Sequence, residues 1–223
     1  MLKAHVTIKG GIGNQLFQYA FGENIKKKWN CEVLYNVDWF DSFGSDTPRV
    51  LALFELFNFD TFKSYNLEIL QSRYASSLLN RFTKFHGKEF RVEKDFNFSE
   101  SYQEMPNKRV KEIFFTGYWQ SGNYFMGIEN DLRKKLLEYK KNFHQFYLME
   151  KILNTTNSTS VHIRRGDYVT NKAAKITFAS CSSNYYINAI NKINQMTNDY
   201  GKFFIFSDDI EWVKNNITVG KNA

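Results

Sequence analysis

The segment 160–168 carries the residue types best suited to binding a phosphorylated ligand. In its sequence, Ser-Val-His-Ile-Arg-Arg-Gly-Asp-Tyr, strand alternation places His162 and Arg164 on one face and the apolar residues on the other. Arg164 and Arg165 are adjacent, and guanidinium groups make bidentate, permanently charged contacts with diphosphate oxygens. We therefore predict an anion-binding site at the carboxyl end of a strand, where open parallel sheets bind ligands. The alternative is an ordinary salt bridge between one arginine and Asp167.

A second polar pair, Ser207 and Asp208, follows the apolar strand-like run 203–206. A carboxylate at such a strand end can accept hydrogen bonds from a guanine base edge or from a ribose hydroxyl. Either side chain can instead be only the N-cap of the helix expected to begin at Ile210. The sequence leaves both interpretations open.

A glycine-rich loop, Gly10–Gln15, precedes an amphipathic helical pattern. Gly11 and Gly13 let a backbone approach a ligand, and the free N–H groups at a helix start attract anions. The dinucleotide-binding fingerprint fails because its third glycine is Leu16, and a P-loop fails because no Gly-Lys-Ser/Thr follows. The loop is either a tight turn or a ligand site, and Asn14 either caps the helix or points its amide at a substrate.

A third cluster, 116–125, combines aromatic and amide side chains after the apolar run 113–115. Aromatic faces stack on sugars and amides bond to hydroxyl groups, so Trp119 and Gln120 are candidates for sugar binding. An aromatic edge of the core with a turn explains the same composition.

The elements that must position these residues form a repeated α/β pattern. A half-buried or edge strand at 4–9, the glycine loop, a helix and a strand at 32–35 form the opening of a parallel sheet. A second such unit starts with the strand containing His162 and ends with the strand 203–206. The polar stretch 154–159 separates the two units, and we predict an N-terminal lobe over 1–156 and a C-terminal lobe over 157–223.

Composition excludes several classes of protein. The chain has 223 residues, 43% hydrophobic and 17% aromatic, which excludes intrinsic disorder. No apolar run has the length of a membrane span, and two cysteines support neither a disulfide framework nor a cysteine-based metal site. The net charge of +7 raises nucleic-acid binding as a hypothesis, but no basic stripe or known nucleic-acid motif accompanies it. We expect no nucleic-acid partner and a cytoplasmic location, with peripheral association at the inner membrane as an option.

Together, these segments resemble the bacterial α-1,2-fucosyltransferases of glycosyltransferase family 11. The matching pieces, in the family's order, are GGIGNQLFQYAFG at 10–22, FTGYWQSGNYF at 115–125, VHIRRGDYV at 161–169 and FIFSDDIEW at 204–212. They cover nearly the whole chain, and GGxGNQ combined with His-x-Arg-Arg-Gly-Asp is highly specific. The resemblance implies an α/β fold of the GT-B type with two Rossmann-like lobes, a GDP-fucose donor, and inverting transfer to the 2-hydroxyl of a galactose-terminated glycan.

The resemblance also implies roles for individual residues. Arg164 is expected to hold the β-phosphate of the donor, His162 and Asp208 to contact the nucleoside, and Asn14 to face the donor from the N-terminal lobe. The full expected donor set is Gly11, Gly13, Asn14, His162, Arg164, Arg165, Ser207 and Asp208; the acceptor set is Trp119 and Gln120; the catalytic set is Arg164 and Asp167.

Fucosyl transfer requires the GDP leaving group to be neutralised as its bond to the sugar breaks. The sequence has no clear metal-ligand cluster, since Asp208 and Asp209 are adjacent rather than an Asp-x-Asp pair. A fixed guanidinium performs the same electrostatic task, so we expect no metal and no other cofactor. The acceptor hydroxyl needs a base, or a hydrogen-bond acceptor if the transition state is strongly oxocarbenium-like. The candidates are Asp167, Asp38 and Glu23.

One departure from the family pattern affects the second lobe. Family members usually continue past the Ser-Asp-Asp helix into a segment rich in Ser, Phe and Trp, whereas this chain ends at Asn222-Ala223. We therefore expect an incomplete C-terminal lobe. The alternative to a fucosyltransferase is a truncated, non-catalytic nucleotide- or glycan-binding remnant of the same family.

Overall fold

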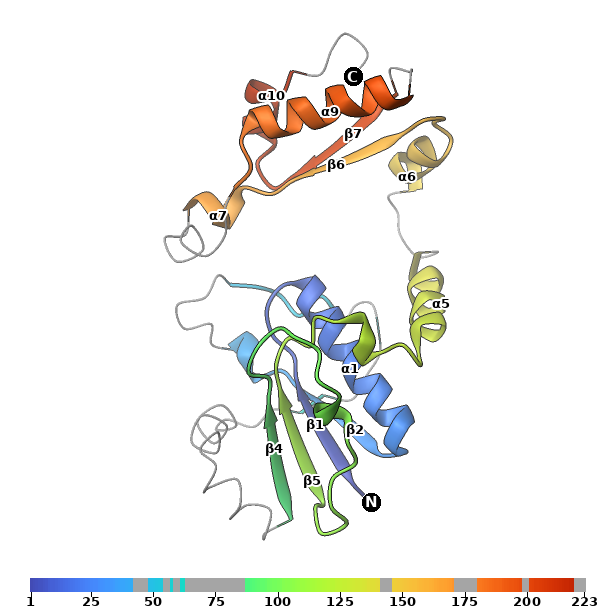
Figure 1. Ribbon diagram of the computed structural model, residues 1–223, viewed down its shortest axis with the longest axis vertical. Coiled ribbons are helices and arrows are strands. Elements are labelled where there is room, and N and C mark those ends of the chain that lie inside the picture. The colour runs from blue at the N-terminus through green and yellow to red at the C-terminus, as the bar shows by residue number, and fades with distance from the viewer. Residues whose placement is uncertain are drawn as a thin grey trace. The chain divides into compact units, whose positions relative to one another are not determined.

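The computed structural model describes residues 1–41, 48–53, 57, 61–62, 87–140, 146–170, 180–197 and 201–218. The chain divides into a first unit, Met1–Asn142, and a second unit, Phe143–Ala223 (Figure 1). The elements of the first unit are β1 (Lys3–Thr7), α1 (Ile12–Trp29), β2 (Glu32–Asn36), η1 (Asp38–Asp41), β3 (Thr61–Phe62), β4 (Lys88–Val92), η2 (Glu100–Gln103), β5 (Glu112–Thr116), η3 (Gly122–Tyr124) and α5 (Glu129–Lys140). Those of the second are α6 (Phe146–Leu153), β6 (Thr159–Ile163), α7 (Gly166–Thr170), α9 (Ser183–Thr197), β7 (Phe203–Ser207) and α10 (Ile210–Asn216).

The first unit contains a sheet of five parallel strands in the order β3-β2-β1-β5-β4. The predicted strand–loop–helix–strand opening is confirmed as β1, α1 and β2. The apolar run 113–115 predicts a buried strand, and this is confirmed as β5. Since β1 pairs with β2 on one side and β5 on the other, it lies at the point where the strand order reverses. Ligands of open parallel sheets bind outside the carboxyl ends of strands at such a point.

The position of β1 corrects the expectation of a half-buried or edge strand. Val6 pairs with Tyr35 of β2 and with Phe115 of β5, so β1 is central. Two of its polar residues are buried as well: His5 and Thr7 are 6% and 2% exposed. The His5 ring stacks on Phe114 with the ring centres 4.4 Å apart, which explains how a polar residue occupies the second face of the sheet.

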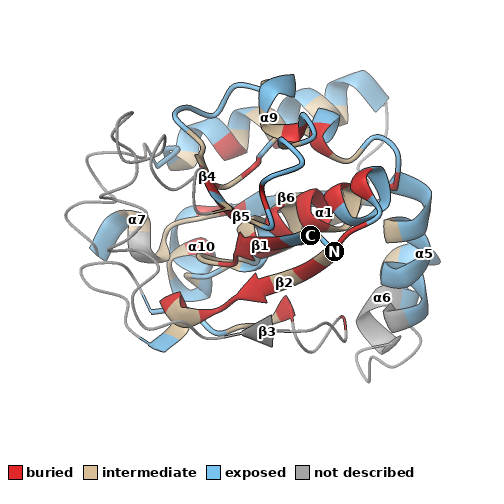
Figure 2. Cartoon of the chain, turned by 90° about the horizontal axis from the view of Figure 1, so that it is seen from below, coloured by how far each residue is buried: buried red, intermediate tan, exposed pale blue. Residues whose placement is uncertain are grey.

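The main core lies between α1 and one face of this sheet. Figure 2 shows buried residues concentrated on α1, β1 and β2. Phe17, Phe21, Ile25 and Trp29 recur at every fourth position, which predicts the apolar face of α1. Phe21, Ile25 and Trp29 are buried, which confirms that face there, while Phe17 is only half-buried. Of the apolar run at 51–59, Leu53 and Phe57 join this core, and residues 54–56 and 58–59 lie outside the described residues.

The second unit contains a parallel pair, β6 and β7, which confirms the predicted repeat of the α/β pattern. Its core joins Ile163 of β6 to Tyr186 and Ile190 of α9 and to Val213 of α10. The expected strand at 203–206 forms, but Phe206 is 38% exposed because α9 and α10 pack on the face that carries Ile163.

The division between the units lies at residues 142 and 143, before the polar stretch 154–159 where the sequence placed it. That stretch joins α6 to β6 within the second unit, and the Thr159 N–H donates to the Lys202 carbonyl at 2.9 Å. The sequence pattern of 129–153 predicts one helix, whereas the structure describes two, α5 and α6, one in each unit. The expected roles of the lobes stay predictions.

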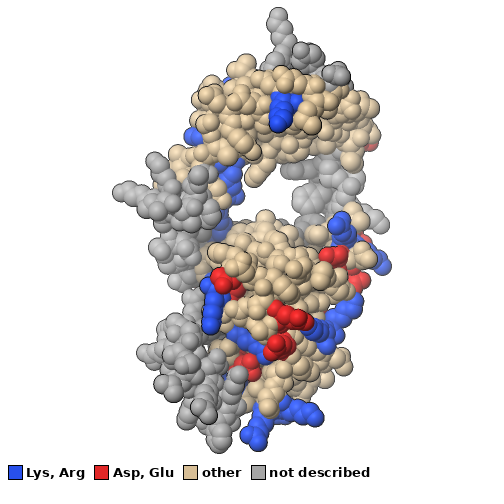
Figure 3. Space-filling view, in the orientation of Figure 1, with Lys and Arg blue, Asp and Glu red and all other residues tan. Residues whose placement is uncertain are grey.

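Charged residues of both signs are mixed on the face of the first unit shown in Figure 3. Lys3 pairs with Glu32 at 3.3 Å and Lys27 with Asp131 at 3.6 Å, and these side chains are well exposed. Such surface pairs contribute little to stability. Among the helices that the structure describes, none is long and apolar enough to cross a membrane.

Burial of His5 predicts a pH dependence of stability. Burial lowers the pKa of the imidazole, although the Glu112 carboxylate, 3.6 Å from Nε2, opposes that effect. Because the unfolded chain binds the proton more readily, the free energy of unfolding should fall as the pH drops below about 6.5, the ordinary pKa of histidine. The loss should continue until the pH passes the lowered pKa of the folded state.

Denaturant unfolding at several pH values checks this expectation. His5→Phe keeps a ring that can stack on Phe114 and removes the titrating group, so its stability should vary less between pH 7.5 and pH 5. Equal pH slopes for the two proteins would contradict the assignment.

Candidate functional site

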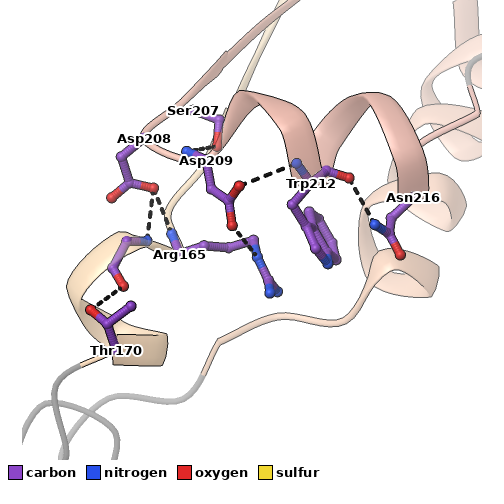
Figure 4. A network of polar contacts seen from close by, with 8 residues as sticks. Arg165, Thr170, Ser207, Asp208, Asp209, Trp212 and Asn216 are labelled. Atoms are coloured by element: carbon purple, nitrogen blue, oxygen red, sulfur yellow. Dashed lines mark hydrogen bonds and ion pairs between the residues drawn. The ribbon is translucent and has the colours of Figure 1, made fainter.

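In the second unit, the Asp208 carboxylate holds the turn that follows β6 (Figure 4). Its Oδ1 accepts hydrogen bonds from the backbone N–H groups of Arg165, at 2.8 Å, and Gly166, at 3.1 Å. A Cβ atom added to Gly166 would lie 2.7 Å from Asp208 Oδ2, so only glycine leaves room for this contact. Asp208 is thus tied to the neighbouring strand end, and it is not the N-cap of α10.

The environment of Asp208 favours its ionised form. Burial by itself raises the pKa of this carboxyl, but the hydrogen bonds from Arg165 and Gly166 and the charge of Arg164 outweigh that effect and lower it. The group is therefore a fixed negative charge at neutral pH, suited to accepting hydrogen bonds and unsuited to donating a proton.

Arg165 is occupied by contacts within the second unit. Its Nε lies 3.3 Å from Asp209 Oδ2, and its guanidinium carbon lies 3.8 Å from the ring centre of Trp212. The other carboxylate oxygen of Asp209 accepts the Trp212 N–H at 3.1 Å and caps α10 (Figure 4). The side chain of Arg165 is only 17% exposed, and its contacts with Asp209 and Trp212 stabilise the second unit.

Arg164 is the more accessible of the two arginines. Its side chain is 41% exposed, and its guanidinium carbon lies 5.1 Å from the ring centre of Tyr168. Its Nε is 3.8 Å from Asp208 Oδ2, a distance at which the charges attract without a direct hydrogen bond. This guanidinium lies near an aromatic ring and a carboxylate, on a side chain that is partly exposed.

The remaining predicted residues of the second unit occupy the same strand ends. His162 is exposed on β6, as the alternation predicted, while Ile163 is buried. Ser207 Oγ accepts the Asp209 N–H at 3.0 Å and so supports the turn into α10. Asp167 belongs to α7, but its side chain lies outside the described part of the structure, and its expected catalytic role stays a prediction.

In the first unit, the loops after β1 and β5 meet at the carboxyl edge of the sheet. Gln120 Nε2 donates a hydrogen bond to Asn14 Oδ1 at 2.6 Å, across 106 residues of sequence. Asn14 does not cap α1, because the N-cap is Gly11 and no side chain bonds there. No residue that the structure describes lies within 4 Å of a Cβ atom added at Gly11 or Gly13, so none of them fills the start of the helix.

Two buried glutamines hold these loops in place. Gln15, 1% exposed, donates to the carbonyl groups of Gly10 and Val50, both at 2.9 Å. Gln18 is fully buried; it accepts the Lys9 N–H at 2.9 Å and donates to the Gly117 carbonyl at 3.0 Å. In the GNQ segment, the buried amide of Gln15 therefore stabilises the loops, whereas the amide of Asn14 is accessible.

The structure corrects the expectation that Trp119 stacks on a sugar. The residue is 0% exposed, and its ring stacks on Phe21 with the centres 4.2 Å apart. Tyr102 and Tyr124 approach the same ring with their edges. The alternative interpretation, an aromatic edge of the core, describes Trp119, whereas the neighbouring Gln120 is exposed and remains the acceptor candidate.

The other candidates for the base occupy different surroundings. Asp38 follows β2 at the carboxyl edge of the sheet, and its Oδ2 accepts a hydrogen bond from Asn36 Nδ2 at 2.9 Å. Glu23 lies within α1, accepts a hydrogen bond from the Tyr35 hydroxyl at 3.1 Å and lies 3.6 Å from Lys135 Nζ. Glu23 is thus held by a hydrogen bond and an ion pair. Asp38 is the better-placed candidate for the base, because it lies at the edge of the sheet where ligands bind.

Sequence reasoning missed several residues that shape these sites: Glu93, Tyr168, Asp209 and Trp212. Asp209 had a usable signal, since an aspartate just before an apolar helical segment is a common N-cap. Glu93, whose carboxylate accepts the N–H groups of Tyr118 and Trp119, had none, because these partners lie 25 and 26 residues further along the chain.

Comparisons with known proteins agree on one family. The model of glycosyl transferase family 11 matches residues 3–223. An alpha-1,2-colitosyltransferase of Escherichia coli is 32% identical over 219 residues, covering 93% of this chain and 69% of that protein. The O-antigen biosynthesis glycosyltransferase WbnK of Escherichia coli is 25% identical over 226 residues, covering 93% and 73%. A galactoside 2-alpha-L-fucosyltransferase of Caenorhabditis elegans is 33% identical over 115 residues, covering 49% and 30%.

The close approach of Gly166 to Asp208 yields a prediction. Gly166→Ala should displace the carboxylate, weaken its hydrogen bonds to the turn and raise the pKa of Asp208 toward its ordinary value. Loss of this contact should also lower the free energy of unfolding of the second unit by about 1 kcal/mol.

An NMR titration of the Asp208 carboxyl together with denaturant unfolding checks both effects. Gly122→Ala is the control, because an added Cβ there meets none of the residues that the structure describes within 4 Å. An unchanged pKa of Asp208 in Gly166→Ala would show that the close approach does not hold the carboxylate.

Proposed function

We propose that this chain, which belongs to glycosyl transferase family 11, transfers fucose from GDP-fucose to the 2-hydroxyl of a galactose in a glycan. The anomeric carbon is inverted in this reaction, and the two units act as the lobes of a GT-B-like enzyme. One matched relative is named for O-antigen biosynthesis, which supports a surface polysaccharide precursor as the acceptor.

The observation that carries the proposal is the accessible guanidinium of Arg164 at the carboxyl end of β6. A β-phosphate there would meet a permanent positive charge held by Asp208 and Tyr168. The exposed His162 and the ionised Asp208 lie at the same strand ends and supply hydrogen-bonding groups for the nucleoside. Arg165 and Ser207 support this site through the turns that they stabilise.

The chemistry is a displacement at the anomeric carbon. The oxygen of the acceptor hydroxyl forms a bond to that carbon while the bond to the β-phosphate oxygen breaks, and the hydroxyl proton passes to a base. Negative charge accumulates on the departing GDP, where the Arg164 guanidinium stabilises it. Among the candidates for the base, Asp38 lies at a sheet edge and Asp167 lies beside the arginines in sequence.

In the first unit, the Asn14–Gln120 pair supports a sugar-binding role. Amide groups donate to and accept from hydroxyl groups, and this pair lies at the reversal point of the sheet. The lack of any described residue within 4 Å of a Cβ atom added at Gly11 or Gly13 supports a ligand at the start of α1.

Arg164→Ala tests the proposal directly. With GDP-fucose and lactose as acceptor, kcat/KM should fall by a factor on the order of 100 or more, because the charge on the leaving group loses its partner. Arg164→Lys should recover only part of that loss, since an ammonium group cannot bind a phosphate bidentately. Arg109→Ala, which removes an exposed arginine of the first unit, is the control.

Two different outcomes would contradict the proposal. A wild-type chain that neither binds GDP nor transfers fucose is not a fucosyltransferase. GDP binding without turnover would support the alternative, a non-catalytic remnant of the family.

A second donor is a specific alternative because one relative is named an alpha-1,2-colitosyltransferase. Colitose is the 3-deoxy counterpart of fucose, so the two GDP-sugars differ by one hydroxyl group. Competition between them in one reaction decides the donor. We expect GDP-fucose to be preferred, and a preference for GDP-colitose would replace fucose in the proposal without changing the site.

A further inference from the structure

We propose that Glu93 is a positioning residue that sets Gln120 for acceptor binding, an inference that rests on the transferase activity proposed above. Glu93 follows β4, whereas Gln120 lies in the turn after the neighbouring strand β5. Glu93 acts through the backbone of that turn, so its role differs from that of a residue that touches the substrate.

The carboxylate of Glu93 accepts the hydrogen bonds that the turn offers. Its Oε2 accepts the Tyr118 N–H at 2.5 Å, and both of its oxygens lie 3.2 Å from the Trp119 nitrogen. The N–H group of Glu93 donates to the Thr116 carbonyl at 2.9 Å, so the residue is joined to β5 at its backbone as well. Hydrogen bonds to a carboxylate are about twice as strong as neutral ones, which suits them to hold a turn.

The turn is shaped around this carboxylate. A Cβ atom added to Gly117 would lie 2.5 Å from Glu93 Cβ and 2.7 Å from its Oε2. Trp119 has a φ of 55°, a left-handed backbone conformation that residues other than glycine rarely adopt. Such a conformation persists only where the surroundings hold it, and here the surroundings are the Glu93 carboxylate and the buried indole ring.

The consequence of this geometry is the placement of Gln120. The residue directly after Trp119 leaves the core, is exposed, and donates to Asn14 Oδ1 at 2.6 Å. Two amides joined by one hydrogen bond still offer a sugar hydroxyl both a donor and an acceptor. Because the pair is formed in advance, an acceptor pyranose need not order it on binding.

Glu93→Gln in the full chain tests the role, with Glu112→Gln as a matched control. The control makes the same change in the same sheet, at the amino end of β5, away from the turn. Glu93→Gln replaces one acceptor oxygen by a donor group and should raise the KM for lactose on the order of tenfold, with the GDP dissociation constant unchanged. The control should leave both constants unchanged.

A double-mutant cycle with Gln120→Ala separates positioning from general damage. If Glu93 acts through Gln120, then Glu93→Gln should change the lactose KM less than about twofold in the Gln120→Ala background. An unchanged KM in Glu93→Gln alone, or an equal effect in both backgrounds, overturns the proposal. If Glu93→Gln does not fold, Glu93→Asp undergoes the same cycle, since it keeps the charge and shortens the side chain.

Amide hydrogen exchange supplies a readout that does not need activity. Exchange at 117–120 should be faster in Glu93→Gln than in the wild type and in Glu112→Gln, and unchanged exchange overturns the positioning role. A wild-type chain without transfer activity would refute the proposed function, and the exchange experiment would still decide what Glu93 does to the turn.

Discussion

Parallel pairing of β1 with β2 and β5 is the constraint on which the first unit depends. Parallel neighbours cannot be joined by a hairpin, so the chain must cross over the sheet between them, and α1 makes the crossover from β1 to β2. The same pairing sends every carboxyl end to one edge. Asn14 and Gln120 can therefore meet there although 106 residues separate them in sequence.

Each unit stabilises the carboxyl edge of its own sheet in the same manner. In each, a carboxylate just after one strand accepts the N–H groups of the turn that follows the neighbouring parallel strand. Glu93 after β4 does this for the turn after β5, and Asp208 after β7 does it for the turn after β6. In each, a glycine of the turn leaves room for the carboxylate, at Gly117 and Gly166. A strand-end turn has N–H groups without ladder partners, and an acidic side chain from the next strand satisfies them.

The two arginines of the second unit illustrate how packing assigns different tasks to adjacent, identical side chains. Arg165 faces Trp212 and Asp209 and is largely buried, so its charge serves the turn before α7 and the start of α10. Arg164 lies beside Asp208 and Tyr168 and keeps 41% of its side chain exposed. A ligand-binding charge requires both a rigid support and access, and only Arg164 combines them.

The sequence by itself determined the α/β class, the parallel strands, the family and the segments that form the sites, because hydrophobic periodicity and short motifs are local properties of a chain. It also placed His162 on the face opposite to Ile163, since alternation along a strand is local as well. The tertiary structure alone decided that β1 is central, that Trp119 is buried while the next residue is exposed, and that Glu93 and Asp208 hold the turns of neighbouring strands. These three features depend on which strands pair. Strand pairing joins residues that are distant in sequence, so no local sequence pattern predicts it.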